Sequence, residues 1–96
     1  MKQLPRTLEV HQLKTVQPYF DDIWMNGKNF EVRKNDRNFK KGDVLLLLEY
    51  EPENANNAKH GYTGRFLEAK ITYVLDNKEY CKEGYVILGI KLKEKE

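Results

Sequence analysis

The longest uninterrupted apolar run in this sequence, Val44–Leu48, has the length of one β-strand. It is far shorter than the roughly 20 residues that cross a bilayer as a helix. The remaining apolar residues fall in short stretches separated by turn-forming residues such as Gly, Pro and Asn. Several short strands with turns between them are typical of a small barrel. A length of 96 residues favours a single domain covering residues 1–96.

Five segments are predicted as β-strands from alternating or continuously apolar residues. They are the stretch around Leu8 and Val10, Phe30–Arg33, Val44–Tyr50, Arg65–Leu75 and Tyr85–Leu92. In the last strand, Val86, Leu88, Ile90 and Leu92 share one face. The polar segment Glu51–Gly61 is predicted as a loop, and Lys93–Glu96 as a frayed, charged tail.

One helix is predicted over Val16–Met25, because its apolar residues recur at spacings of three and four. Thr15 offers an N-cap hydroxyl, and Pro18 is tolerated in a first helical turn. Asn26-Gly27 is predicted to end the helix, since Gly adopts the left-handed conformation common at helix C-termini.

These elements predict a mixed α+β fold. We expect a small, mostly antiparallel β-barrel of five or six strands, with one main α-helix that follows the first strand and packs over an open end. The expected core consists of Val16, Phe20, Ile23, Phe30, Val32, Leu45, Leu47, Ile71, Val74, Val86, Leu88 and Ile90.

The composition, 40% hydrophobic and 33% charged residues, is typical of a soluble globular domain. Cys81 is the one cysteine, so we expect a free thiol and a reducing, cytoplasmic environment. One Cys and two His fall short of the four ligands usual in structural zinc sites. Residues 1–6 lack the apolar segment of a secretory leader. We therefore expect a monomer without metal, cofactor or membrane contact.

Positive charge is concentrated in residues 26–41. This stretch holds six Lys or Arg residues and two acidic ones, a net charge of +4, whereas the whole chain carries +2 and the remainder therefore −2. Such a cluster is either a solvated charged surface or a site for an anionic ligand such as nucleic acid.

Strand alternation predicts which side chains of this cluster lie on the same face of the sheet. Glu31 and Arg33 should share one face of their strand, just after Lys28 at the preceding turn, while Phe30 and Val32 face the core. A carboxylate between two cations orients both, and a guanidinium fork suits phosphate or a base edge. The plainer interpretation is a surface salt-bridge ladder worth less than about 1 kcal/mol.

The motif Lys28-Asn29-Phe30-Glu31-Val32-Arg33 resembles the K-x-x-E-x-R core of ASCH domains, small relatives of the PUA RNA-binding barrel. Further short motifs, in the same order, resemble a bacterial and phage ASCH-like family of unknown function, of the DUF3850 type. They are His11–Lys14, Arg33–Arg37, Gly42-Asp43, Glu49-Tyr50 and Tyr62–Arg65, and the resemblance covers about His11 to Ile90. One departure is the position of Gly27, one place closer to Lys28 than in the usual G-x-K.

The resemblance implies a PUA-like barrel that binds RNA or a nucleotide in a cleft beside the motif. Lys28, Glu31 and Arg33 would line the cleft. Further residues would extend its rim, namely Lys34, Asn35 and Arg37, with Tyr62, Thr63, Arg65, His11 and Lys14 as additional candidates. For Tyr62–Arg65, the plainer interpretation is a turn with Gly64 in a left-handed conformation. For His11, it is a satisfied polar contact at the start of the helix.

Two other functions stay open at this point. Some small ASCH-like proteins are amidohydrolases that deacetylate acetylated cytidine, using the motif Lys with a Thr three residues later. Here Lys28 is followed at that position by Glu31, so the nucleophile is missing, although Lys28 and Glu31 remain candidate catalytic residues for a nucleotide or RNA hydrolase. A third possibility is a basic face that docks an acidic protein.

The binding hypothesis predicts a contrast between two variants. Arg33→Ala should weaken RNA binding by about 1–3 kcal/mol and by more than Lys40→Ala, because a cleft guanidinium makes paired hydrogen bonds. If both side chains are exposed, neither variant should change stability much.

Overall fold

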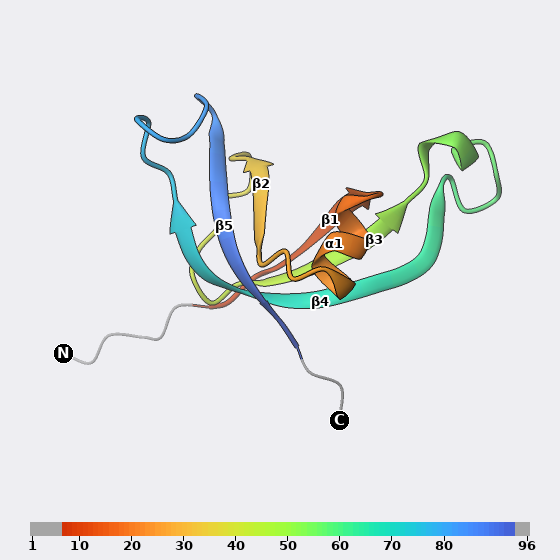
Figure 1. The fold of residues 1–96 in the computed structure, drawn as a ribbon, viewed down its shortest axis with the longest axis horizontal. Coiled ribbons are helices and arrows are strands. Elements are labelled where there is room, and N and C mark those ends of the chain that lie inside the picture. The colour runs from red at the N-terminus through yellow and green to blue at the C-terminus, as the bar shows by residue number, and fades with distance from the viewer. Residues whose placement is uncertain (1–6, 94–96) are drawn as a thin grey trace.

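The computed structural model describes residues 7–93, in which five strands form one curled sheet with a single α-helix. In chain order the elements are β1 (Val10–Val16), α1 (Tyr19–Met25), β2 (Phe30–Lys34), β3 (Val44–Tyr50), a 3-10 turn (Pro52–Asn54), β4 (Tyr62–Leu75) and β5 (Tyr85–Leu92). Figure 1 shows a half-barrel: the long β4 curves along its base, and α1 lies between its two arms. The expectations for residues 1–6 and 94–96 lie outside the described residues.

The strand order is β1-β3-β4-β5-β2. The β1–β3 pair is parallel, and the other three pairs are antiparallel. The prediction of a mostly antiparallel, barrel-like sheet is thus confirmed at this level. β1 and β2 are the two edge strands, and no backbone ladder joins them within residues 7–93.

The predicted element positions are correct for β3 and β5, whereas β4 starts earlier, at Tyr62. The helix starts later than predicted because β1 continues to Val16. Thr15 is therefore not a helix cap: it lies in β1, and its hydroxyl donates to the Leu13 carbonyl at 3.2 Å. The predicted end at Asn26-Gly27 is confirmed, with Gly27 at φ +76°.

β1 buries its His11 face. His11, Leu13 and Thr15 are buried, while Leu8 and Val10 are 56% and 61% exposed. The cause is the pairing with β3, whose Leu45 and Leu47 face the core and stand beside His11 and Leu13. Parallel neighbours in register present the same face, so the partner strand decides which side of β1 is buried.

The core side of β2 is the opposite of the predicted one. Phe30 and Val32 are 43% and 54% exposed, whereas Glu31 is buried. Glu31 stands opposite Leu88 of β5, a fully buried core residue, and this register turns the charged side of β2 inward. The motif carboxylate is therefore an interior group and not part of a surface ladder.

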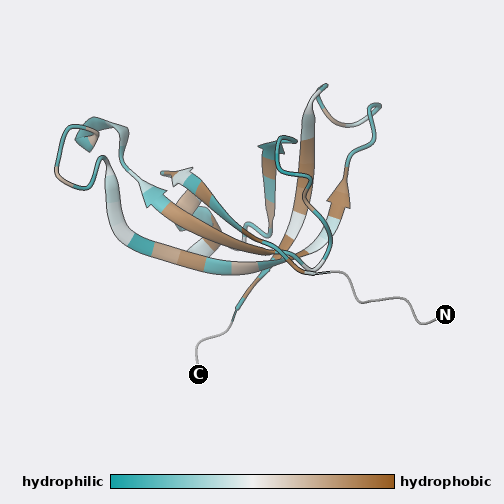
Figure 2. Ribbon diagram, turned by 180° about the vertical axis from the view of Figure 1, so that it is seen from behind, coloured by the Kyte–Doolittle hydropathy of each residue, from teal (hydrophilic) through white to brown (hydrophobic). Residues whose placement is uncertain are grey.

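The core lies inside the curl of the sheet. Of the expected core residues, those that are buried are Phe20, Ile23, Leu45, Leu47, Ile71, Val86, Leu88 and Ile90. Val74 packs against this core, Val16 is only half-buried, and Leu13, Phe39 and Ala69 join it without having been predicted. Figure 2 shows β3 hydrophobic along most of its length, with a polar tip.

Cys81 is buried and carries a free thiol, as expected, and its Sγ donates to the Leu75 carbonyl at 3.3 Å. Within residues 7–93, the one helix is too short and too polar to cross a membrane.

Gly61 should be sensitive to substitution. Its φ is +93°, and a Cβ there would lie 2.5 Å from Cε1 of the Tyr50 ring. Gly84 has a similar φ of +81° but open space around it, so Gly84→Ala carries the backbone cost of about 1 kcal/mol alone. We expect Gly61→Ala to lower the free energy of unfolding by roughly 1 kcal/mol more than Gly84→Ala in urea titrations. Equal losses would mean that the Tyr50 ring moves aside freely.

Candidate functional site

The three motif side chains meet around the buried carboxylate of Glu31. Its Oε1 accepts from Lys28 Nζ at 2.7 Å, and its Oε2 accepts from Arg33 Nε at 2.8 Å and lies 2.7 Å from Arg33 Nη2. Lys28 Nζ also donates to the Phe30 carbonyl at 2.7 Å. The alternation of β2 and the turn at Gly27 bring these groups together, so the convergence expected from the sequence is present, on the inner face of the sheet.

Arg33 also ties the two edge strands to each other. Its Nη1 donates to the Lys14 carbonyl at 2.9 Å, and its Nη2 donates to Thr15 Oγ1 at 3.1 Å, both in β1. Arg37 Nη1 adds a bond to the Gln12 carbonyl at 2.8 Å. Guanidinium groups thus bridge the gap that a closed barrel would span with backbone hydrogen bonds. All three nitrogens of Arg33 are engaged inside the protein.

A second buried carboxylate, Glu49, lies next to this cluster. It stands beside Thr15 in the β1–β3 register and so faces the same side of the sheet. Arg65 donates to it through Nε (2.8 Å) and Nη2 (2.6 Å), Thr63 Oγ1 donates at 2.6 Å, and Gln17 Nε2 donates at 2.5 Å. The two carboxylates, each clamped by cations, form what we call the inner cluster: Lys28, Glu31, Arg33, Glu49, Thr63 and Arg65.

The hydrogen bonds from Arg65 lower the pKa of Glu49 from 4.5 to about 2, against the opposing effect of burial and with help from Thr63 and Gln17. The same pairing raises the pKa of Arg65. Glu49 is consequently ionised at neutral pH and is a weak base.

Sequence reasoning missed Glu49 and Gln17. The signal for Glu49 was its place in β3, two and four residues after the buried Leu47 and Leu45, where an acidic residue must face the interior. The signal for Gln17 was weak, because it lies between β1 and α1 in no regular element.

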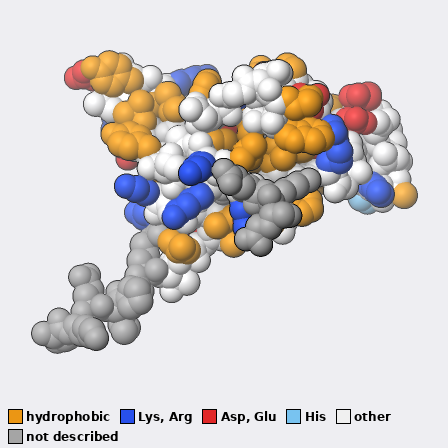
Figure 3. Space-filling model, turned by 60° about the horizontal axis from the view of Figure 1, so that its bottom comes forward, with side chains coloured by type: hydrophobic (Ala, Val, Ile, Leu, Met, Phe, Trp, Pro, Cys, Tyr) orange, Lys and Arg blue, Asp and Glu red, His pale blue; other side chains and the backbone are white. Residues whose placement is uncertain are grey.

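Aromatic rings flank the two cations of the inner cluster that lie nearest the helix. Lys28 Nζ is 4.8 Å from the Phe30 ring centroid and 5.7 Å from that of Tyr19. The Arg65 Cζ is 5.0 Å from the Trp24 ring. Tyr19, Trp24 and Phe30 are all exposed. Figure 3, which brings the underside of the molecule in Figure 1 forward, shows hydrophobic side chains beside Lys and Arg side chains on that underside.

The remaining predicted site residues lie elsewhere. Lys14 and Tyr62 are on the opposite face of the sheet, where Lys14 Nζ is 4.2 Å from the Tyr50 ring and 6.0 Å from the Tyr62 ring. Lys34 and Asn35 are exposed at the end of β2, beside Arg37. The predicted set is therefore divided between two faces of the sheet and its edge.

His11 lies at the start of β1, far from the inner cluster. Its Nε2 is 3.0 Å from Asp43 Oδ2, and its ring packs edge-on against Phe39. Asp43 also accepts from the backbone N–H groups of Glu9 and Lys40. Glu9, His11 and Asp43 offer metal-ligand atoms within 4.8 Å of one another. Their hydrogen bonds give them a structural role, which holds β1 to the turn before β3.

Comparison with known proteins agrees with the motif order. A family model described as "Domain of unknown function (DUF3850)" matches residues 10–90. Over 80 residues, the chain is 38% identical to an uncharacterized 12.9 kDa protein encoded in the GpA 3′ region of Escherichia phage P2. That match covers 83% of this chain and 66% of the phage protein, so the chain spans just under two thirds of its relative. The chain belongs to the DUF3850 family of domains of unknown function.

Proposed function

We propose that this protein is an RNA- or nucleotide-binding module of the ASCH and PUA-like type. The observation that carries the proposal is the pairing of cations with exposed aromatic rings beside the inner cluster: Lys28 with Phe30 and Tyr19, and Arg65 with Trp24. Aromatic rings stack unpaired bases, and Lys and Arg contact phosphates. These rings and cations, in α1 and beside it, offer both kinds of contact that single-stranded RNA needs.

Within this proposal the motif residues have different tasks. Arg65 is 48% exposed, and its Nη1 makes none of the bonds to Glu49, so it can donate to a phosphate. Lys28 is 17% exposed and presents its charge at the rim. Glu31 and Arg33 act as positioning residues, because the carboxylate is buried and the guanidinium is held by Glu31, Lys14 and Thr15.

A hydrolase is less well supported by the same geometry. The hydroxyl closest to a carboxylate in the inner cluster is Thr63 Oγ1, which is 2.6 Å from Glu49. A general base works best with a pKa near the working pH. Glu49, with a pKa of about 2, is far too weak a base to activate that hydroxyl. Lys28 donates to Glu31 and to the Phe30 carbonyl, so it does not supply a base for that hydroxyl either.

Trp24 provides a direct test because it is the one tryptophan of the chain and lies beside Arg65. We expect single-stranded RNA or a nucleotide to quench Trp24 fluorescence, and the quenching to weaken as salt rises, since phosphate contacts release counterions. Tyr19→Ala should weaken binding about fivefold or more, because it removes one stacking ring. Tyr80→Ala is the matched control: Tyr80 is 71% exposed and lies outside this surface. Unchanged fluorescence with every nucleotide and RNA tested at low salt would refute the proposal.

A further inference from the structure

The sheet has a second apolar surface, on the side opposite the core. In β1, β3 and β4 the residues between the inward-facing ones form rows across the three strands. In order along the sheet, the rows are Val16, Tyr50 and Tyr62, then Lys14, Leu48 and Phe66, then Gln12, Leu46 and Glu68, and then Val10, Val44 and Lys70. We call this surface the outer face. Leu67 and Ala69 of β4 pack in or against the core, so Phe66 and Lys70 point away from it.

Phe66 is the most informative residue of the outer face. It is 58% exposed and pairs with Leu48 of β3, in the part of β4 that precedes the pairing with β5 at Ala69. Its neighbour Leu48 and the nearby Tyr50 and Tyr62 are only half-buried. Phe66, Leu48, Tyr50 and Tyr62 therefore form one contiguous apolar patch, the kind of surface that indicates a contact site.

Cations border this apolar surface. Lys14 lies at one side, above Tyr50. At the far end of the face, Lys70 and Lys91 stand directly opposite each other on β4 and β5, an arrangement of like charges that destabilises a sheet. Neither has an acidic partner among residues 7–93, whereas Lys93 reaches Glu68 at 3.3 Å.

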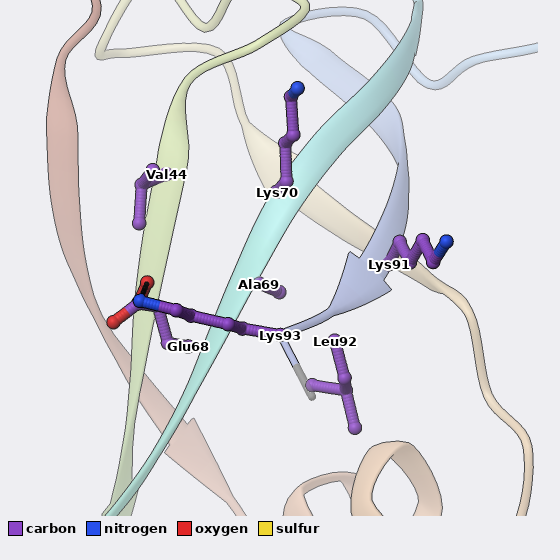
Figure 4. Close-up of a pocket in the computed structure, with 7 residues that line it drawn as sticks. All are labelled: Val44, Glu68, Ala69, Lys70, Lys91, Leu92 and Lys93. Atoms are coloured by element: carbon purple, nitrogen blue, oxygen red, sulfur yellow. Dashed lines mark ion pairs between the residues drawn. The ribbon is translucent and has the colours of Figure 1, made fainter. Parts of the chain in front are cut away.

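A groove of about 440 Å³ is lined by the three lysines Lys70, Lys91 and Lys93, together with Val44, Glu68, Ala69 and Leu92. Figure 4 shows Lys93 crossing β4 toward Glu68, while Lys70 and Lys91 point away from each other. The groove thus has a partly apolar lining, and the ammonium groups of Lys70 and Lys91 at its rim have no acidic partner among residues 7–93. A phosphate in the groove would supply this opposite charge.

We propose that the outer face binds single-stranded nucleic acid along β4. Bases stack on Phe66 and on the Tyr62 ring, and phosphates lie at Lys14 and at the groove formed with Lys70 and Lys91. From Tyr62 to Lys70 the strand spans about 26 Å at 3.3 Å per residue, enough for a site of at least about four nucleotides. This surface uses none of the inner-cluster residues and goes beyond the function proposed above.

The residue types favour nucleic acid over a protein partner. Protein interfaces are depleted in Lys, whereas phosphate sites require cations. Among the described residues of this face, Lys14, Lys70 and Lys91 have no acidic partner, and Glu68, which lies on the same face, is paired with Lys93. A platform of aromatic rings bordered by cations is the arrangement that binds single strands without sequence preference.

The experiment measures fluorescence anisotropy of a labelled single-stranded RNA of about 12 nucleotides, and of the DNA of the same sequence, over a salt series. The test variants are Phe66→Ala and the double variant Lys70→Ala/Lys91→Ala. The matched control is Lys78→Ala/Lys82→Ala, which removes the same charge from two exposed residues in the segment between β4 and β5, outside the face. We expect the affinity of each test variant to fall at least about fivefold. The double variant should also reduce the slope of log K against log salt by about 1.4, since each phosphate that a lysine neutralises contributes about 0.7.

Equal losses in the double variant and its control, or no loss in Phe66→Ala, would overturn the proposal. The proposal would also be overturned, in favour of protein docking, if the parent protein bound neither oligonucleotide but bound an acidic polypeptide such as polyglutamate. In that case the double variant should no longer bind the polypeptide. Trp24 fluorescence separates this site from the inner one. If an oligonucleotide binds without quenching Trp24 fluorescence, the result supports the outer face alone. If a nucleotide still quenches Trp24 fluorescence in the double variant, the result supports the inner site independently.

Discussion

Arg33→Ala is expected to lower the free energy of unfolding by about 3 kcal/mol, which makes it one of the two largest effects in this chain. The substitution leaves the buried carboxylate of Glu31 with Lys28 as its remaining cationic partner. It also removes the two hydrogen bonds that reach from β2 to the Lys14 carbonyl and the Thr15 hydroxyl of β1. The expectation that this variant leaves stability unchanged depended on an exposed side chain, and Arg33 is only 21% exposed.

Urea denaturation followed by circular dichroism measures this effect, with Lys40→Ala as the control. Lys40 belongs to the same basic stretch but is exposed, and its contact with Asp43 uses the backbone N–H, which the substitution retains. We expect a loss within about 0.5 kcal/mol for Lys40→Ala. The loss of stability in Arg33→Lys should lie between those of Arg33→Ala and Lys40→Ala, since an ammonium keeps the charge but cannot make the forked contacts. Similar losses for Arg33→Ala and Lys40→Ala would show that the bridge between β1 and β2 is not needed for stability.

The positions of the strands were predictable because alternation and turn residues act locally, as the correct bounds of β3 and β5 show. The side of β2 that faces the core was not. Phe30 and Val32 are more apolar than Glu31 and Arg33, so hydrophobicity alone places them inside. The register with β5 turns the charged pair inward instead, and the pair neutralises itself there through hydrogen bonds. Partners that lie about 55 residues away in sequence decided this outcome.

The same limit applies to the inner cluster. Convergence of Lys28, Glu31 and Arg33 follows from a turn and two residues of strand alternation, which are local. The partners of Glu49 come from β4 and from the segment before α1, and only the folded sheet brings them together. The sequence pattern therefore identified one of the two carboxylates of the inner cluster as a site residue.

The structure also changes the meaning of the local charge of +4 in residues 26–41. Lys28 and Arg33 are paired with a buried carboxylate, and Arg37 bonds to the Gln12 carbonyl of β1. Much of this charge is therefore engaged in contacts within the protein that connect the two edge strands, and it is not available to bind a ligand. The cations best placed to meet an anion are the half-exposed Arg65 and the outer lysines Lys14, Lys70 and Lys91, all of which lie outside the basic stretch.

The second large effect is a loss of stability in acid that depends on Glu49. Its folded pKa of about 2 lies below its ordinary value of 4.5, so folding favours the ionised form. The resulting stabilisation is fully present above pH 4.5 and is lost as the pH falls toward 2. Because Arg65 is half-exposed and solvent screens the pair, we expect this stabilisation to be on the order of 2 kcal/mol.

Urea titrations from neutral pH to about pH 2 test this expectation by comparing the parent protein with Glu49→Gln and Glu53→Gln. Glu49→Gln should be less stable than the parent at neutral pH, because a neutral amide cannot match the charge of Arg65. Since it has no carboxyl to protonate at this position, the gap between it and the parent should narrow below pH 4.5. Glu53 is exposed in the 3-10 turn, so Glu53→Gln should follow the parent curve throughout. A constant gap between Glu49→Gln and the parent across this range would mean that Glu49 titrates normally, and that Arg65 does not hold it ionised.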